Sequence, residues 1–138
     1  MFREDFFNYI ASELLEKNIV KDSYLNAIKQ RESEFPTGLA TKVGINVAIP
    51  HTDTEHANED LVVFSRVGKS LRFSLMEDPE ESIETRLIFN IIVKNPSNQI
   101  KFLTKLMGLF QQEELLKYLL EEKNKKNITI KLNNFINN

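Results

Sequence analysis

The segment from Thr85 to Val93 is the most continuously apolar run in the chain, and it constrains the fold more than any other stretch. It reads Thr-Arg-Leu-Ile-Phe-Asn-Ile-Ile-Val and is followed by Lys-Asn-Pro, where the apolar run ends. A strand that is apolar on both of its faces is typical of the centre of a sheet covered by helices on both sides. The run therefore predicts an α/β domain with this segment as a central strand.

Two helices are predicted ahead of the sheet. Apolar residues recur at three- and four-residue spacing from about Arg3 to Lys17, which indicates an amphipathic helix. After a short loop, Asp22 or Ser23 can cap a second helix that runs to about Glu34. Pro36 prevents its continuation. The two helices are therefore expected to form an antiparallel pair.

Further strands are expected between this helical pair and the central run. Ile45 to Ile49 is a short apolar segment that ends at Pro50. Leu61 to Val67 is rich in β-branched residues, and the next three residues, Gly68 to Ser70, have the composition of a turn. Since Leu71 to Phe73 alternates again, we expect a short hairpin here.

The C-terminal third is predicted to be mostly helical. Ser97 or Asn98 is expected to cap a helix, and another helix should follow Gln111. The apolar residues from Ile128 to Ile136 fit either a short strand or an amphipathic helical turn, and their spacing does not decide. The expected fold is α/β, with residues 1–138 as a single domain whose small mixed parallel and antiparallel sheet is flanked by helices on both faces.

Composition excludes several classes of function. The formal net charge of −2 over 138 residues supplies no basic field for nucleic acid, and no apolar run approaches the roughly 20 residues that span a bilayer. The absence of cysteine rules out disulfides, thiolate metal sites and cysteine nucleophiles. The acidic start, Met-Phe-Arg-Glu-Asp, is unlike a signal peptide. A cytoplasmic protein is expected.

Chemistry is expected at His51, which directly follows Pro50. The proline stops strand pairing and delivers the next side chain at a strand end, where α/β folds carry their sites. Three interpretations are open from the residues alone. The histidines have no task, or His51, Asp53 and His56 bind a metal without an evident fourth ligand. In the third, a neutral, pre-oriented imidazole acts as a nucleophile.

The stretch around His51 resembles a known active-site signature. Thr37-Gly38, then Gly44, then Val47-Ala48-Ile49-Pro50-His51-Thr52 are similar to the signature of IIA domains of the bacterial phosphoenolpyruvate-dependent sugar phosphotransferase system, of the fructose and mannitol type. The ending His-Thr-Asp, with Phe-Pro-Thr-Gly-Leu before it, is most similar to the galactitol-type subgroup. The resemblance extends over roughly Tyr24 to Leu120 and includes these further residues: Arg31, Glu32, Phe73, Met76, Asp78 and Pro79.

The resemblance implies a phosphocarrier. His51 would accept a phosphoryl group from the phosphohistidine of the carrier protein HPr and pass it to a IIB domain, which serves a membrane-bound IIC component. Charge on the phosphoryl oxygens would be compensated by protein donors without a metal or cofactor. The donors expected from the resemblance are Arg31, Thr37, Thr52 and Gln99.

Gln99 is also a departure from the family pattern. Members of the mannitol branch have a second histidine at the corresponding position, and glutamine can hydrogen-bond there but cannot carry a proton or positive charge. His56 is not an evident substitute.

Two alternatives to a phosphocarrier are open. One is a regulatory module that uses His51 phosphorylation as a signal, and the other is a non-catalytic metal-binding or structural domain.

An acidic cluster follows His51. It is either a solvated loop or a surface that steers the basic face of HPr toward the histidine. Its members are Asp53, Glu55, Glu59 and Asp60.

Overall fold

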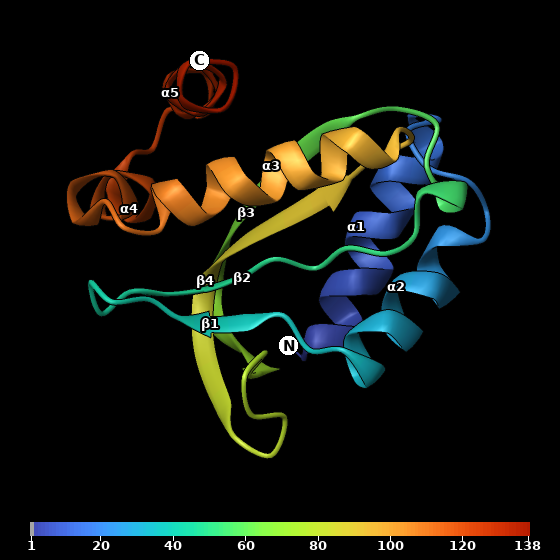
Figure 1. Ribbon diagram of the computed structural model, residues 1–138, viewed down its shortest axis with the longest axis horizontal. Coiled ribbons are helices and arrows are strands. Elements are labelled where there is room, and N and C mark those ends of the chain that lie inside the picture. The colour runs from blue at the N-terminus through green and yellow to red at the C-terminus, as the bar shows by residue number, and fades with distance from the viewer. Residues whose placement is uncertain (1) are drawn as a thin grey trace.

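A computed structural model describes residues 2–138. In this part of the chain one four-stranded sheet, with the strand order β1-β2-β4-β3, lies between helices (Figure 1). The elements are α1 (Arg3–Glu16), α2 (Tyr24–Glu34), β1 (Gly38–Ala40), β2 (Asn46–Ala48), η1 (Thr54–His56), β3 (Leu61–Ser74), β4 (Ser82–Ile92), α3 (Pro96–Leu109), α4 (Glu113–Glu121) and α5 (Lys125–Ile136).

Strand β4 lies in the interior of the sheet, as its apolar sequence predicts. It pairs with β2 in parallel, where Ala48 is opposite Ile88, and with β3 in antiparallel orientation. Strands β1 and β2 are also antiparallel, so the sheet is mixed. Every residue from Leu87 to Val93 is buried. The prediction of a central strand in a mixed sheet is therefore confirmed.

Helices cover both faces of this sheet. The pair α1 and α2 packs on one face through residues such as Phe7 and Ile28, while α3, α4 and α5 pack on the other through residues such as Leu106 and Leu116 (Figure 1). Each of these four side chains is essentially inaccessible to solvent. Burial of one such side chain contributes about 1.5–3 kcal/mol. The predicted arrangement of helices on both faces is confirmed.

The predicted hairpin is wrong. Residues 61–74 form the single strand β3, which stays paired with β4 from Leu61 opposite Ile92 to Ser74 opposite Ser82. The pairing register shifts between Arg66 and Leu71, so the glycine-containing segment is an irregularity within the strand and does not reverse it. The chain reverses further on, between β3 and β4.

Several helix boundaries also differ from expectation. The N-cap of α3 is Asn95, whose side chain accepts from Ser97 N, and neither predicted residue occupies the cap. Ser23 is the N-cap of α2, as one of the predicted options, but its hydroxyl makes no capping bond. The ambiguous last segment is the helix α5, since the Asn124 side chain caps it by accepting from two backbone N–H groups. Strand β1 has no counterpart among the expected elements. No helix among the described residues is both long and apolar enough to cross a membrane.

Gly38 is placed where a larger residue does not fit. A Cβ at this position would lie 2.7 Å from the backbone oxygen of Ser74 and 3.1 Å from the Cβ of Phe73. We expect Gly38→Ala to lower the free energy of unfolding by about 1–3 kcal/mol. Gly68→Ala is the matched control, because a methyl group at Gly68 would meet no heavy atom within 4 Å. Urea unfolding of both variants measures this, and equal stabilities would contradict the prediction.

Candidate functional site

His51 lies just beyond β2, at the end of the sheet where the two parallel strands finish. It forms a parallel bridge with Ile91 of β4, and Ile91 N donates to Pro50 O at 3.0 Å. The residue is 8% exposed. In Figure 1 the chain after β2 runs below α3 and crosses in front of α1. The carboxyl ends of parallel strands thus frame the imidazole, as in other α/β sites.

The imidazole is held in one tautomer by the backbone. His51 Nδ1 lies 2.7 Å from Ile49 O. Because a carbonyl oxygen can only accept, Nδ1 carries the hydrogen and the lone pair is on Nε2. Burial lowers the pKa of His51 and the charge of Arg31 acts in the same direction, whereas the Ile49 carbonyl and Asp53 oppose them. The neutral imidazole with a free Nε2 lone pair is therefore the favoured form.

This shift has a measurable consequence for titration. We expect the NMR titration midpoint of His51 to lie below its ordinary value of 6.5. As pH falls below 6.5, the unfolded chain binds the proton first, so His51 reduces the stability of the fold until its lower folded-state pKa is passed. A His51→Gln variant should lose this component of the pH dependence. A midpoint above 6.5 would contradict the expected direction.

Arg31 places a cation close to His51. It lies in the last turn of α2, and its Nη1 is 4.0 Å from Asp53 Oδ1, while the guanidinium carbon is 4.7 Å from the centre of the Phe35 ring. Its Nε is buried and has no hydrogen-bond partner in the part of the chain that the structure describes. The guanidinium therefore retains donor capacity beside the histidine.

Thr37 is bound to a carboxylate to which sequence reasoning assigned no role. Glu32 is only 2% exposed, and its Oε2 accepts from Thr37 N while its Oε1 accepts from Thr37 Oγ1, both at 2.7 Å. The only side-chain proton of Thr37 is thus used on Glu32, and donation to a phosphoryl group would require this bond to break. The sequence offered one signal, the Arg-Glu pair, but not its geometry.

Thr52, Gln99 and His56, the remaining residues considered for the site, make no hydrogen bond to His51. Thr52 is buried next to His51 in sequence, and Gln99 is half-buried in the first turn of α3. Neither side chain hydrogen-bonds to His51, so their predicted role stays a prediction. His56 is bound elsewhere, since its Nδ1 is 2.7 Å from the hydroxyl of Ser23 at the opposite end of α2 from Arg31.

The acidic residues after His51 do not act as one group. Asp53 faces Arg31, and Asp60 Oδ1 accepts from Lys94 N and Asn95 N ahead of α3. Burial alone would raise the pKa of Asp60, but these hydrogen bonds lower it. Glu55 and Glu59 are exposed and can still act in steering. Among residues 2–138 no three histidine or acidic side chains are placed to hold a metal ion.

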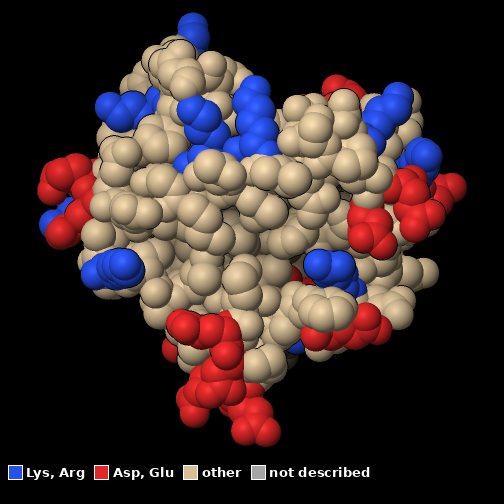
Figure 2. Space-filling model, in the orientation of Figure 1, with Lys and Arg blue, Asp and Glu red and all other residues tan. Residues whose placement is uncertain are grey.

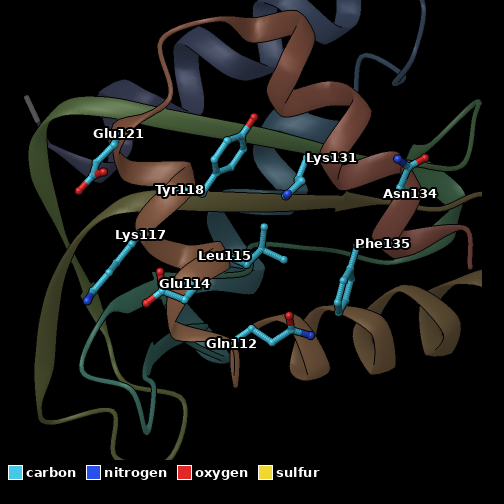
Figure 3. A pocket seen from close by; sticks show the side chains of 9 residues that line it. All are labelled: Gln112, Glu114, Leu115, Lys117, Tyr118, Glu121, Lys131, Asn134 and Phe135. Atoms are coloured by element: carbon cyan, nitrogen blue, oxygen red, sulfur yellow. The ribbon is translucent and has the colours of Figure 1, made fainter.

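Two grooves formed by the described residues lie away from His51. One of about 770 Å³ lies between α4 and α5, where Lys131 Nζ is 5.2 Å from the centre of the Tyr118 ring (Figure 3). Another, of about 610 Å³, lies between β3 and α5. His51 lines neither groove. The histidine is thus presented at a strand end outside these grooves.

The family model described as "Phosphoenolpyruvate-dependent sugar phosphotransferase system, EIIA 2" matches residues 2–135. The chain belongs to this family, which confirms the family resemblance, and it is thus an EIIA phosphotransferase component. It is 31% identical over 118 residues to the galactitol-specific EIIA component of Escherichia coli (strain K12), covering 86% of this chain and 77% of the relative. It is 28% identical over 110 residues to the fructose-specific EIIA component of Haloferax volcanii, covering 78% and 66%.

Solved structures share the fold. The crystal structure of IIA mannitol from Escherichia coli aligns with a TM-score of 0.72 at 23% identity, covering 94% of this chain and 87% of that one. The IIA component in the complex of IIAMTL with phosphorylated IIBMTL from the same species aligns with a TM-score of 0.71 at 21% identity, covering 99% and 88%. These likenesses confirm the expected α/β architecture.

Proposed function

We propose that Nε2 of His51 accepts a phosphoryl group from phosphorylated HPr and passes it to a IIB component. The observation that carries this proposal is the hydrogen bond of 2.7 Å between Nδ1 and Ile49 O, which leaves Nε2 as the nitrogen with the lone pair. A nucleophile of this kind needs a neutral, pre-oriented imidazole. Both the hydrogen bond and the lowered pKa of His51 support that state.

The transfer balances without an added proton acceptor. The lone pair on Nε2 of His51 forms the new N–P bond while the N–P bond of the donor's phosphohistidine breaks, and its electron pair returns to the donor's imidazole. The hydrogen on Nδ1 stays in place, so the phosphorylated ring carries a positive charge. The Ile49 carbonyl accepts from this Nδ1–H and stabilises the cation. Transfer to the IIB component repeats the exchange in the reverse sense at Nε2.

Arg31 is the proposed compensation for charge on the phosphoryl oxygens. In the present state its guanidinium faces the Asp53 carboxylate at 4.0 Å, and its Nε has no partner among the described residues. A guanidinium fork suits phosphate oxygens, so the incoming phosphoryl group can replace Asp53 as its partner. Thr52 and Gln99 are proposed as additional donors.

We propose a galactitol-like sugar or polyol system as the context of this transfer. The galactitol-specific relative is 31% identical to this chain, which supports the assignment. The solved mannitol IIA was studied in a complex with phosphorylated IIB, which supports a IIB component as acceptor here. The position of His51 at a strand end, outside both the groove between α4 and α5 and the groove between β3 and α5, suits exchange between protein surfaces. The membrane component IIC would be reached only through IIB.

The test is a reconstituted relay. Purified protein is incubated with radiolabelled phosphoenolpyruvate, enzyme I and HPr, and we expect an acid-labile, base-stable label that requires HPr. Addition of a galactitol-type IIB component should then remove the label from the chain and transfer it to IIB. Absence of label on the wild-type chain would overturn the proposal, and label that no IIB removes would overturn its carrier role.

A further inference from the structure

We infer that Glu32 is a positioning residue for His51, because its buried carboxylate anchors the loop whose backbone fixes the imidazole tautomer. This inference rests on the proposed role of His51. The two residues are nineteen positions apart in sequence. Three consecutive sets of hydrogen bonds connect them in space, through Thr37 and Ile49.

The first set joins the end of α2 to the loop before β1. Both carboxylate oxygens of Glu32 are used, since one accepts from Thr37 N and the other from Thr37 Oγ1, each at 2.7 Å. Glu32 is 2% exposed and Thr37 is equally buried, so water does not compete for these bonds. Hydrogen bonds to a buried charged group are among the stronger ones in proteins. Thr37 is therefore held on both its backbone and its side chain.

The second and third links run from Thr37 to the histidine. Thr37 O accepts from Ile49 N at 3.2 Å, just beyond β2, and Ile49 O then accepts from His51 Nδ1 at 2.7 Å. The same residue, Ile49, thus donates to the anchored loop and orients the ring. A shift of Thr37 would move the Ile49 peptide groups and with them the acceptor that holds the hydrogen on Nδ1. Ile49 is fully buried, so its carbonyl has no water as a replacement partner.

The charges around Glu32 fit an anchoring carboxylate. Burial raises the pKa of Glu32, whereas the bonds from Thr37 and the charges of Arg3 and Arg31 lower it. Both oxygens accept, which matches the carboxylate form, since a protonated oxygen would have to donate. The carboxylate therefore stands between two guanidinium groups and the loop. Arg31, one of these groups, is also the cation proposed to bind the phosphoryl oxygens.

The experiment reads the tautomer directly. Long-range proton–nitrogen NMR spectra distinguish Nδ1–H from Nε2–H histidine, and His56, which binds Ser23, is an internal control in the same spectrum. We expect the wild-type protein to show the Nδ1–H form of His51. Glu32→Leu has a similar volume but removes both acceptors of the Thr37 bonds, so we expect the Nε2–H form of His51 to appear. The phosphoryl-transfer rate should fall roughly ten- to hundredfold.

A pair of Thr37 variants covers the case in which Glu32→Leu does not fold. Thr37→Val removes only the bond to Oε1, whereas Thr37→Ser retains both bonds. The inference is supported if Thr37→Val changes the His51 tautomer and Thr37→Ser keeps the wild-type tautomer. Folded variants that all show the wild-type tautomer and transfer rate would overturn it. The NMR result requires no phosphoryl donor. If the wild-type protein takes no label but the variants change the His51 tautomer as expected, the proposed function is contradicted and the positioning role is not.

Discussion

His51→Ala is expected to abolish phosphorylation from phosphoenolpyruvate, enzyme I and HPr. The variant replaces the imidazole by a methyl group and so removes Nε2, whose lone pair the Nδ1–Ile49 O bond leaves available, and no group remains at this position to form the N–P bond. The loss should reach at least about a thousandfold, the range seen when a nucleophile is removed. The measurement is the initial rate of labelling at a fixed concentration of phosphorylated HPr.

The matched control is His56→Ala. His56 Nδ1 is bound to Ser23 Oγ, and its Nε2 faces Glu55 at 3.7 Å, so the second imidazole is tied to the other end of α2. We expect this variant to take label at a rate close to wild type. Circular dichroism verifies that both variants are folded. Label that persists in His51→Ala and disappears in His56→Ala would reverse the assignment.

Arg31→Gln should produce the second largest effect. The variant keeps hydrogen-bonding capacity but removes the charge that faces the site, and loss of one preorganised charge-stabilising group typically lowers a rate by about 10²–10³-fold. Because the charge of Arg31 lowers the pKa of His51, the titration midpoint should also rise in the variant. Labelling kinetics and NMR titration measure the two effects on the same sample.

Arg72→Gln serves as the charge-matched control for Arg31→Gln. Arg72 is an exposed residue of β3, where it is opposite Glu84 of β4. Its removal changes the net charge by the same amount and should leave both the rate and the His51 midpoint unchanged. Arg31→Lys retains a cation without the planar fork and should give an intermediate rate. Equal rates for Arg31→Gln and Arg72→Gln would exclude a direct role for Arg31.

The charge distribution on one face of the molecule is uneven (Figure 2). Acidic side chains gather at the lower end of this view, below the sheet, where Figure 1 shows the turn between β3 and β4. That turn contains Glu77, Asp78, Glu80 and Glu81, all exposed. The predicted steering surface after His51 is separate in sequence from this turn, and Asp60 is already engaged with backbone donors. Steering by the remaining members stays a prediction.

The parts of the fold that sequence predicts correctly depend on local periodicity. The central strand is apolar on both faces because helices cover both, and that condition is visible within its own residues. The hairpin predicted at Gly68 to Ser70 is wrong because the composition of these residues does not determine whether the strand ends there. Glycine and polar residues fit a turn or an irregularity within a strand equally well, and only the length of β4 decides that β3 continues past them.

For the site, the sequence alone indicated the family and the strand-end position of His51, and the resemblance predicted a cation at Arg31. These follow from contiguous motifs and from the rule that proline ends strand pairing. Only the tertiary structure decided which nitrogen of His51 is free and that Glu32 anchors Thr37. A tautomer depends on where one carbonyl oxygen points, and a buried carboxylate depends on donors that the folded loop brings to it. Residue spacing encodes neither the direction of the Ile49 carbonyl nor the donors that reach the Glu32 carboxylate.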